Sequence, residues 1–178
     1  PGAFDGEPLA LYNAVPGQLL ANFNATTLRL KPDGEQVRIE PDIALPGVAL
    51  SSQLVLQESP ECNGWKDTLT PAQPDPERLE LVISGRYARG CGEQAWSISL
   101  FEAAATFDFV FRGLWAEAGG TLTGATLPGM APQSAPLLSF ASEPLTVALI
   151  GLNKHSNNLM TRNLFLTLGV EAYGAPAT

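Results

Sequence analysis

Positive charge, histidine and cysteine are all scarce in this sequence. Ten Lys and Arg residues stand against eighteen Asp and Glu residues, which gives a net charge of −8, and the basic residues are scattered along the chain. A nucleic-acid-binding protein needs basic side chains clustered on one face. The composition therefore excludes nucleic acid as a partner and disfavours an anionic membrane surface.

Long hydrophobic runs are missing as well. The longest apolar stretch, residues 145–152, is less than half of the ~18 residues that a membrane span needs, so we predict no transmembrane segment. The single histidine, His155, lies far in sequence from Cys62 and Cys91, which excludes the usual zinc ligand sets. We predict no metal and no other cofactor. The two cysteines form one disulfide or remain separate buried thiols, and the residues alone leave both open.

Glycine and proline are abundant, with 17 and 15 residues of 178, and they divide the first hundred residues into short segments. Residues 27–31 and 36–40 alternate apolar and polar side chains around Pro32-Asp33-Gly34, which predicts a β-hairpin. A second strand pair is predicted at residues 9–15 and 18–23, and two more strands at 79–84 and 95–100. The proline-rich residues 71–76 predict a loop.

The hydrophobic period changes near residue 100. Apolar side chains recur at helical spacing over residues 101–118, and Gly119-Gly120 is a typical helix end. A short strand is predicted at residues 120–126. Ser142 is the expected N-cap of a second helix, with Pro144 in its first turn.

A third helix is predicted over residues 157–168, with a stop at Gly169. The expected fold is thus α+β: a β-rich part over residues 1–99 and a helical part over residues 100–178. Trp65, Trp96 and Trp115 are interpreted as core residues rather than as a platform for a sugar.

Few residues offer catalytic chemistry. The sequence has no Gly-x-Ser-x-Gly, no His-Glu-x-x-His and no glycine-rich phosphate loop. What remains is Ser156-Asn157-Asn158, three polar residues between two apolar helices. On this pattern alone, the favoured hypothesis is that Ser156 caps the third helix.

The wider sequence resembles the DacB-type penicillin-binding proteins, a class C low-molecular-mass group. Residues 142–145, 152–160 and 164–169 resemble the region around the second active-site motif of that family. The resemblance continues upstream in order and covers nearly the whole chain. It includes Tyr12-Asn13-Ala14-Val15-Pro16, Cys62-Asn63-Gly64-Trp65, Gly85-Arg86-Tyr87, Cys91-Gly92-Glu93 and Phe111-Arg112-Gly113-Leu114-Trp115.

The resemblance implies a periplasmic serine D-alanyl-D-alanine carboxypeptidase/endopeptidase that acts on peptidoglycan stem peptides and binds β-lactams. Ser156 and Asn158 match the family's Ser-x-Asn motif. By this analogy Ser156 relays a proton to the leaving D-alanine amine, and Asn158 binds the substrate's peptide and orients a lysine. A periplasmic location also implies that Cys62 and Cys91 are joined as a disulfide.

The sequence departs from the family in the other two motifs. No Ser is followed by Lys three residues later, and none of Lys31, Lys66 and Lys154 precedes Thr-Gly. With Pro1 as its first residue, the chain is expected to be an internal fragment: part of an inserted β-rich domain (1–99) and the resumed catalytic domain (100–178). We expect this fragment to be inactive alone. The alternative is that the β-rich part is a non-catalytic cell-wall binding or spacer module.

Overall fold

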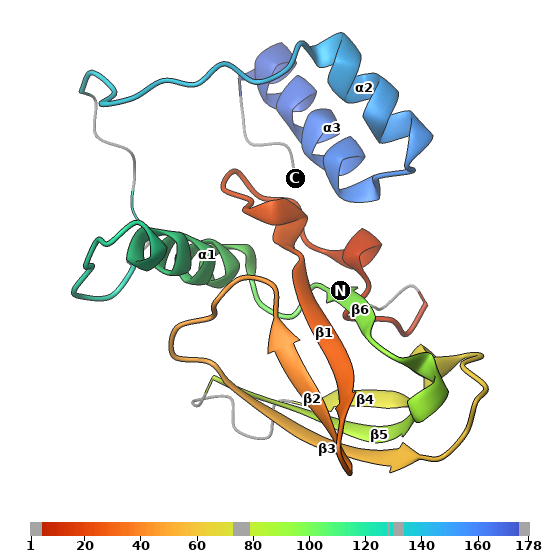
Figure 1. Ribbon diagram of the computed structural model, residues 1–178. Coiled ribbons are helices and arrows are strands. Elements are labelled where there is room, and N and C mark those ends of the chain that lie inside the picture. The colour runs from red at the N-terminus through yellow and green to blue at the C-terminus, as the bar shows by residue number, and fades with distance from the viewer. Residues whose placement is uncertain (1–4, 73–78, 128, 130–133, 175–178) are drawn as a thin grey trace.

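The computed structural model describes residues 5–72, 79–127, 129 and 134–174. In these residues the strands precede the α-helices, so the predicted α+β class is confirmed (Figure 1). The strands are β1 (Thr26–Asp33), β2 (Gln36–Pro41), β3 (Ala49–Gln57), β4 (Leu69–Ala72), β5 (Glu80–Ala88) and β6 (Gln94–Ile98). The helices are α1 (Ala103–Glu117), α2 (Leu145–Lys154) and α3 (Asn158–Tyr173). None of the helices within the described ranges is long and apolar enough to cross a bilayer.

The strands form two small sheets, with the orders β2-β1-β6 and β3-β5-β4. The β1–β2 hairpin is confirmed: Asp33 lies opposite Gln36, and Gly34 between them has a φ of 60°, a conformation that costs glycine little. β3 and β5 pair in parallel along their whole length. A parallel pair needs a long crossover connection, and here the crossover carries β4, which pairs antiparallel with β5.

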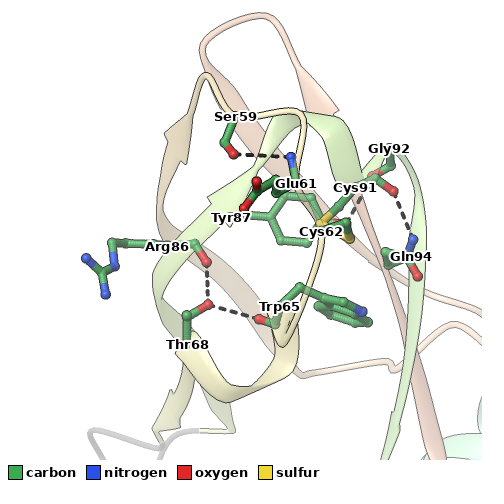
Figure 2. Close-up of a disulfide and its surroundings, with 10 residues drawn as sticks. All are labelled: Ser59, Glu61, Cys62, Trp65, Thr68, Arg86, Tyr87, Cys91, Gly92 and Gln94. Atoms are coloured by element: carbon green, nitrogen blue, oxygen red, sulfur yellow. Dashed lines mark hydrogen bonds between the residues drawn. A yellow bond between two sulfur atoms is a disulfide. The ribbon is translucent and has the colours of Figure 1, made fainter.

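The core lies between the inner faces of the two sheets. Alternate residues of β1, Leu28 and Leu30, are fully buried and meet Ile83 and Tyr87 of β5. Cys62 of the crossover is disulfide-bonded to Cys91, just after β5, which confirms the predicted pairing (Figure 2). The ring of Trp65 meets that of Tyr87 edge to face at 5.9 Å, so the disulfide and two aromatic rings close this end of the core.

The buried Tyr87 should make the stability of the fold depend on pH in the alkaline range. Burial raises its pKa to about 12 from the ordinary 10.0, with a smaller contribution from Glu93. Between these two values only the unfolded chain loses the phenolic proton. The free energy of unfolding should therefore be unaffected by this group below pH 10 and fall as the pH rises through about 12. Urea midpoints measured across this range check the prediction, and a slope that persists unchanged in Tyr87→Phe would contradict it.

The strand pair predicted at residues 9–15 and 18–23 is wrong. These segments hold two short 3₁₀ helices, η1 (Leu11–Asn13) and η2 (Asn22–Asn24). All three residues of η2 have positive φ, between 48° and 58°, which stops any strand from continuing. The buried Asn24 amide donates to Ser99 Oγ and to the Phe101 carbonyl oxygen, both at 2.9 Å, so long-range hydrogen bonds override the local apolar pattern.

Two strands were not anticipated in the sequence. The first is β3 and the second is β4. β4 contains Pro71, so the loop predicted at residues 71–76 is wrong at its start; residues 73–76 of that loop lie outside the described residues.

The ends of two helices differ from the predicted ones. Ser142 does not cap α2, because Pro144 holds the N-cap position, and α3 continues past Gly169 to a left-handed Gly174.

The helix predicted at residues 101–118 is confirmed as α1, but the strand predicted at 120–126 is wrong. Arg112 donates to the Gly124 carbonyl oxygen at 2.8 Å, so side chains of α1 hold this irregular segment in place of a partner strand. Burial raises the pKa of Asp108, but hydrogen bonds from Thr126 and Arg112 outweigh this effect, so the pKa of Asp108 is lowered overall.

Trp115 of α1 is 45% exposed, so its interpretation as a core residue is wrong.

Candidate functional site

The Ser156-Asn157-Asn158 triplet forms the turn between α2 and α3, which lie side by side as a helical hairpin (Figure 1). α2 ends at Lys154, and the His155 amide donates to the Gly151 carbonyl oxygen at 3.0 Å. Ser156 then takes a φ of 50°, in the left-handed region. This reversal lets the Asn157 amide donate to the Leu152 carbonyl oxygen at 3.0 Å, which closes α2.

Asn157, not Ser156, is the N-cap of α3. Its Oδ1 accepts a hydrogen bond from the Met160 amide at 3.0 Å, and its carbonyl oxygen accepts one from the Thr161 hydroxyl at 3.0 Å. The hypothesis that Ser156 caps this helix is therefore wrong. All three residues of the triplet are of types that can cap a helix, and the backbone path out of α2 decides which one does.

The capping arrangement leaves Ser156 and Asn158 unused by the fold. Both residues are exposed, and within the described part of the chain neither side chain makes a hydrogen bond. A non-glycine residue with φ near 50° is conformationally costly, and such residues cluster at functional sites. The turn thus presents a hydroxyl and a carboxamide, two residues apart, on a rigid helix–helix junction.

The turn is anchored on its α3 side. Leu159, the residue after Asn158, is only 2% exposed, and it anchors the first turn of α3. One turn further on, the Arg162 guanidinium donates to the Ala14 carbonyl oxygen at 3.1 Å and ties α3 to the segment that contains η1. The sequence did not single out Arg162, because its partner lies almost the whole chain away.

Aliphatic side chains continue from the turn along both helices. An open groove of about 250 Å³ runs between α2 and α3 and is lined mainly by Leu145, Leu149, Leu152, Met160 and Leu164. Ile150, Phe165 and Leu168 are more than half exposed. The helical hairpin therefore has apolar surface well beyond what its two helices cover in each other.

Acid–base chemistry has little support near the turn. His155 is exposed and lies next to Ser156, but the chain provides no Ser-x-x-Lys serine for either residue to act on. Among residues 5–72, 79–127, 129 and 134–174, no group of three or more His, Cys, Asp or Glu side chains lies close enough to hold a metal ion. The turn can donate and accept hydrogen bonds, but within the described residues no base is hydrogen-bonded to the Ser156 hydroxyl to activate it as a nucleophile.

Comparison with known proteins agrees with this architecture. Two crystal structures of penicillin binding protein 4 (dacB) from Haemophilus influenzae share the fold, one of them complexed with a β-lactam. The complex has a TM-score of 0.67 at 23% identity and matches 93% of this chain. The other has a TM-score of 0.69 at 22% identity and matches 95%.

This chain spans only 38% and 37% of the length of those two structures. Among curated proteins, none matches this sequence. The family model of the D-Ala-D-Ala carboxypeptidase 3 (S13) family, however, matches residues 7–178, which include both sheets, all three helices and the Ser156–Asn158 turn. The chain therefore belongs to the D-Ala-D-Ala carboxypeptidase 3 (S13) family.

Proposed function

We propose that the protein to which this chain belongs is a serine-type D-Ala-D-Ala carboxypeptidase/endopeptidase of the periplasm. Its substrates are peptidoglycan stem peptides, and its inhibitors are β-lactams. Family membership supports the carboxypeptidase activity. The disulfide between Cys62 and Cys91 supports an oxidising compartment such as the periplasm.

The proposed site rests on one observation in the α2–α3 turn: the residue that caps α3 is not one of the two residues of the Ser-x-Asn motif that we assign to catalysis. Asn157 caps α3, so the Ser156 hydroxyl and the Asn158 carboxamide remain exposed and free to act on another group. In acyl transfer a proton must reach the leaving amine, and a donor must hold the substrate's peptide. We assign the first role to Ser156 and the second to Asn158.

A proton relay needs a group on each side of it. The nucleophile and its lysine would come from a Ser-x-x-Lys motif, which this sequence does not contain. We propose that another part of the protein supplies that motif and packs against the apolar surface of α2 and α3, bringing it to the Ser156 hydroxyl. Burial in such a contact would also strengthen every hydrogen bond at the turn.

We further propose that residues 1–99 are an inserted β-rich domain and residues 100–178 part of the catalytic domain. All strands of the described residues end before residue 99, and all α-helices begin after it. The segment around η1 is shared, because Arg162 of α3 bonds to Ala14. The β-rich part would then serve as a spacer or as a module that binds the cell wall.

Labelling with a fluorescent penicillin tests this assignment. The 178-residue chain should remain unlabelled on a denaturing gel, because covalent attachment requires the Ser-x-x-Lys serine. The whole protein should be labelled and should release D-alanine from a peptide that ends in D-Ala-D-Ala. Labelling of the 178-residue chain would place the nucleophile within it and contradict the proposed division of motifs.

A further inference from the structure

The two sheets leave an opening on one side of the core. β2 and β3 lie next to each other, so β6 and β4 are the outer strands at the opposite edges of the two sheets. A cleft of about 810 Å³ lies between these edges, within the range of small-molecule sites. The N-terminal residues 7–12 form its third wall, held to the end of β6 by a hydrogen bond from the Ser99 amide to the Leu9 carbonyl oxygen at 2.9 Å.

Aromatic and polar side chains meet in this cleft. Trp96 of β6 packs against the core, as the sequence predicts, but it is only half-buried and also lines the cleft. Tyr12 of η1 is 45% exposed. The exposed Glu7, Lys66 and Asp67 contribute two carboxylates and one ammonium group. The Lys66 Nζ lies 5.4 Å from the centre of the Trp65 ring, within the range of a cation–π interaction.

We propose that this cleft binds a saccharide chain. A pyranose ring has an apolar face of C–H groups, which packs on a flat aromatic surface such as Trp96, and a rim of hydroxyl groups. Hydroxyl protons suit the Glu7 and Asp67 carboxylates as acceptors, and hydroxyl oxygens suit Lys66 as a donor. The excess of carboxylates over ammonium groups favours an uncharged ligand over an anionic one.

An extended peptide fits this cleft less well. A peptide could bind by adding a strand to an open sheet edge. However, β4 has Pro71 in the wall of the cleft, and proline has no amide to donate. Residues 7–12 already cover the end of β6. The polar and aromatic side chains of the cleft, Glu7, Asp67 and Trp96 among them, remain available to a sugar.

The saccharide that we expect is the glycan strand of peptidoglycan. This identity rests on the proposed function, whereas the site itself rests on the geometry of the cleft. The probe is therefore a simple hexosamine oligomer, chitotetraose, titrated into the 178-residue chain and followed by amide chemical shifts. We expect a dissociation constant of about 1 mM or tighter, with shifts confined to residues 7–12, 66–71 and 96–98.

The double variant Glu7→Gln, Asp67→Asn removes both carboxylates without touching the core. It should weaken binding by about tenfold or more, because two charged hydrogen-bond acceptors are lost at exposed positions. The matched control, Glu35→Gln, Glu117→Gln, makes the same change of charge at exposed positions outside the cleft and should bind as the original chain does. Trp96→Phe keeps a ring and should weaken binding only several-fold.

Three outcomes would overturn the proposal: no shift with chitotetraose at millimolar concentration, equal affinity of the two double variants, or shifts in these residues with a D-Ala-D-Ala peptide in place of the sugar. None of them depends on acylation, which needs the Ser-x-x-Lys motif that this chain lacks. Failure of the saccharide site and failure of the carboxypeptidase assignment are therefore separate results.

Discussion

Ser156→Ala in the whole protein is expected to slow acylation by a penicillin by about 10²- to 10⁴-fold, the usual effect of removing a positioned acid–base group. Stability should change by less than ~0.5 kcal/mol, because the Ser156 hydroxyl is exposed and does not cap α3. The measurements are the acylation rate at one temperature and the urea midpoint with its slope, both on the same preparation.

Asn157→Ala is the matched control, one residue away in the same turn. It removes the hydrogen bond from the Met160 amide and should cost about 1 kcal/mol of stability. Asn157→Asp keeps an acceptor and should restore most of that loss. If Asn157→Ala slows acylation as much as Ser156→Ala does, the effect lies in the shape of the turn and not in the Ser156 hydroxyl.

Asn158→Ala separates substrate binding from proton transfer. Asn158 is exposed and makes no side-chain hydrogen bond within the described residues, so its loss should leave the urea midpoint unchanged. We expect slower acylation through weaker binding of the substrate's peptide group. An unchanged rate in both Ser156→Ala and Asn158→Ala would remove the turn from the mechanism altogether.

Loss of the disulfide should have the largest effect on stability. Cys62 and Cys91 are 29 positions apart, and closing a loop of that size stabilises a protein by roughly 3–4 kcal/mol in the chain-entropy model. The bond also lies against Tyr87 and Trp65, so its removal should loosen this end of the core. The free energy of unfolding of the oxidised chain should exceed that of the reduced chain by this amount.

Reduction of the unmodified chain and the double variant Cys62→Ala, Cys91→Ala provide two independent measurements. Both should lower the urea midpoint, and the reduced form tests the bond without removing any sulfur atom. Intact mass after alkylation of the denatured, unreduced protein should show no modified thiol. If the free energies of unfolding of the oxidised and reduced chains differ by less than ~1 kcal/mol, the crossover and β5 stay together without the disulfide.

Local patterns predicted the local parts of the fold. The β1–β2 hairpin and α1 each follow from a short stretch of sequence, since alternation and a glycine turn, or helical spacing, are sufficient. β3 has only a weak signal, because Ser52 interrupts the alternation of Leu50, Leu54 and Leu56. Its partner β5 lies beyond the crossover and runs parallel to it, so the pairing that completes the strand Ala49–Gln57 is long-range.

Local sequence patterns were also insufficient to predict the arrangement of the candidate site. The positions of Ser156 and Asn158 follow from the resemblance to a family, but the choice of cap does not. Ser, Asn and Asn in succession are equally good caps by type, and the bond between the Asn157 amide and the Leu152 carbonyl oxygen selects Asn157. The tie between Arg162 and Ala14 has no sequence signal at all.

The order of the strands has a consequence for how the chain folds. The β1–β2 hairpin joins neighbours in sequence and can form early, whereas β6 pairs with β1 only after the chain has passed through the other sheet. That pairing closes a long loop whose entropy is unfavourable until β3, β5 and the disulfide have shortened it. Oxidation of Cys62 and Cys91 should therefore precede the addition of β6, and the last-formed strand is one wall of the open cleft.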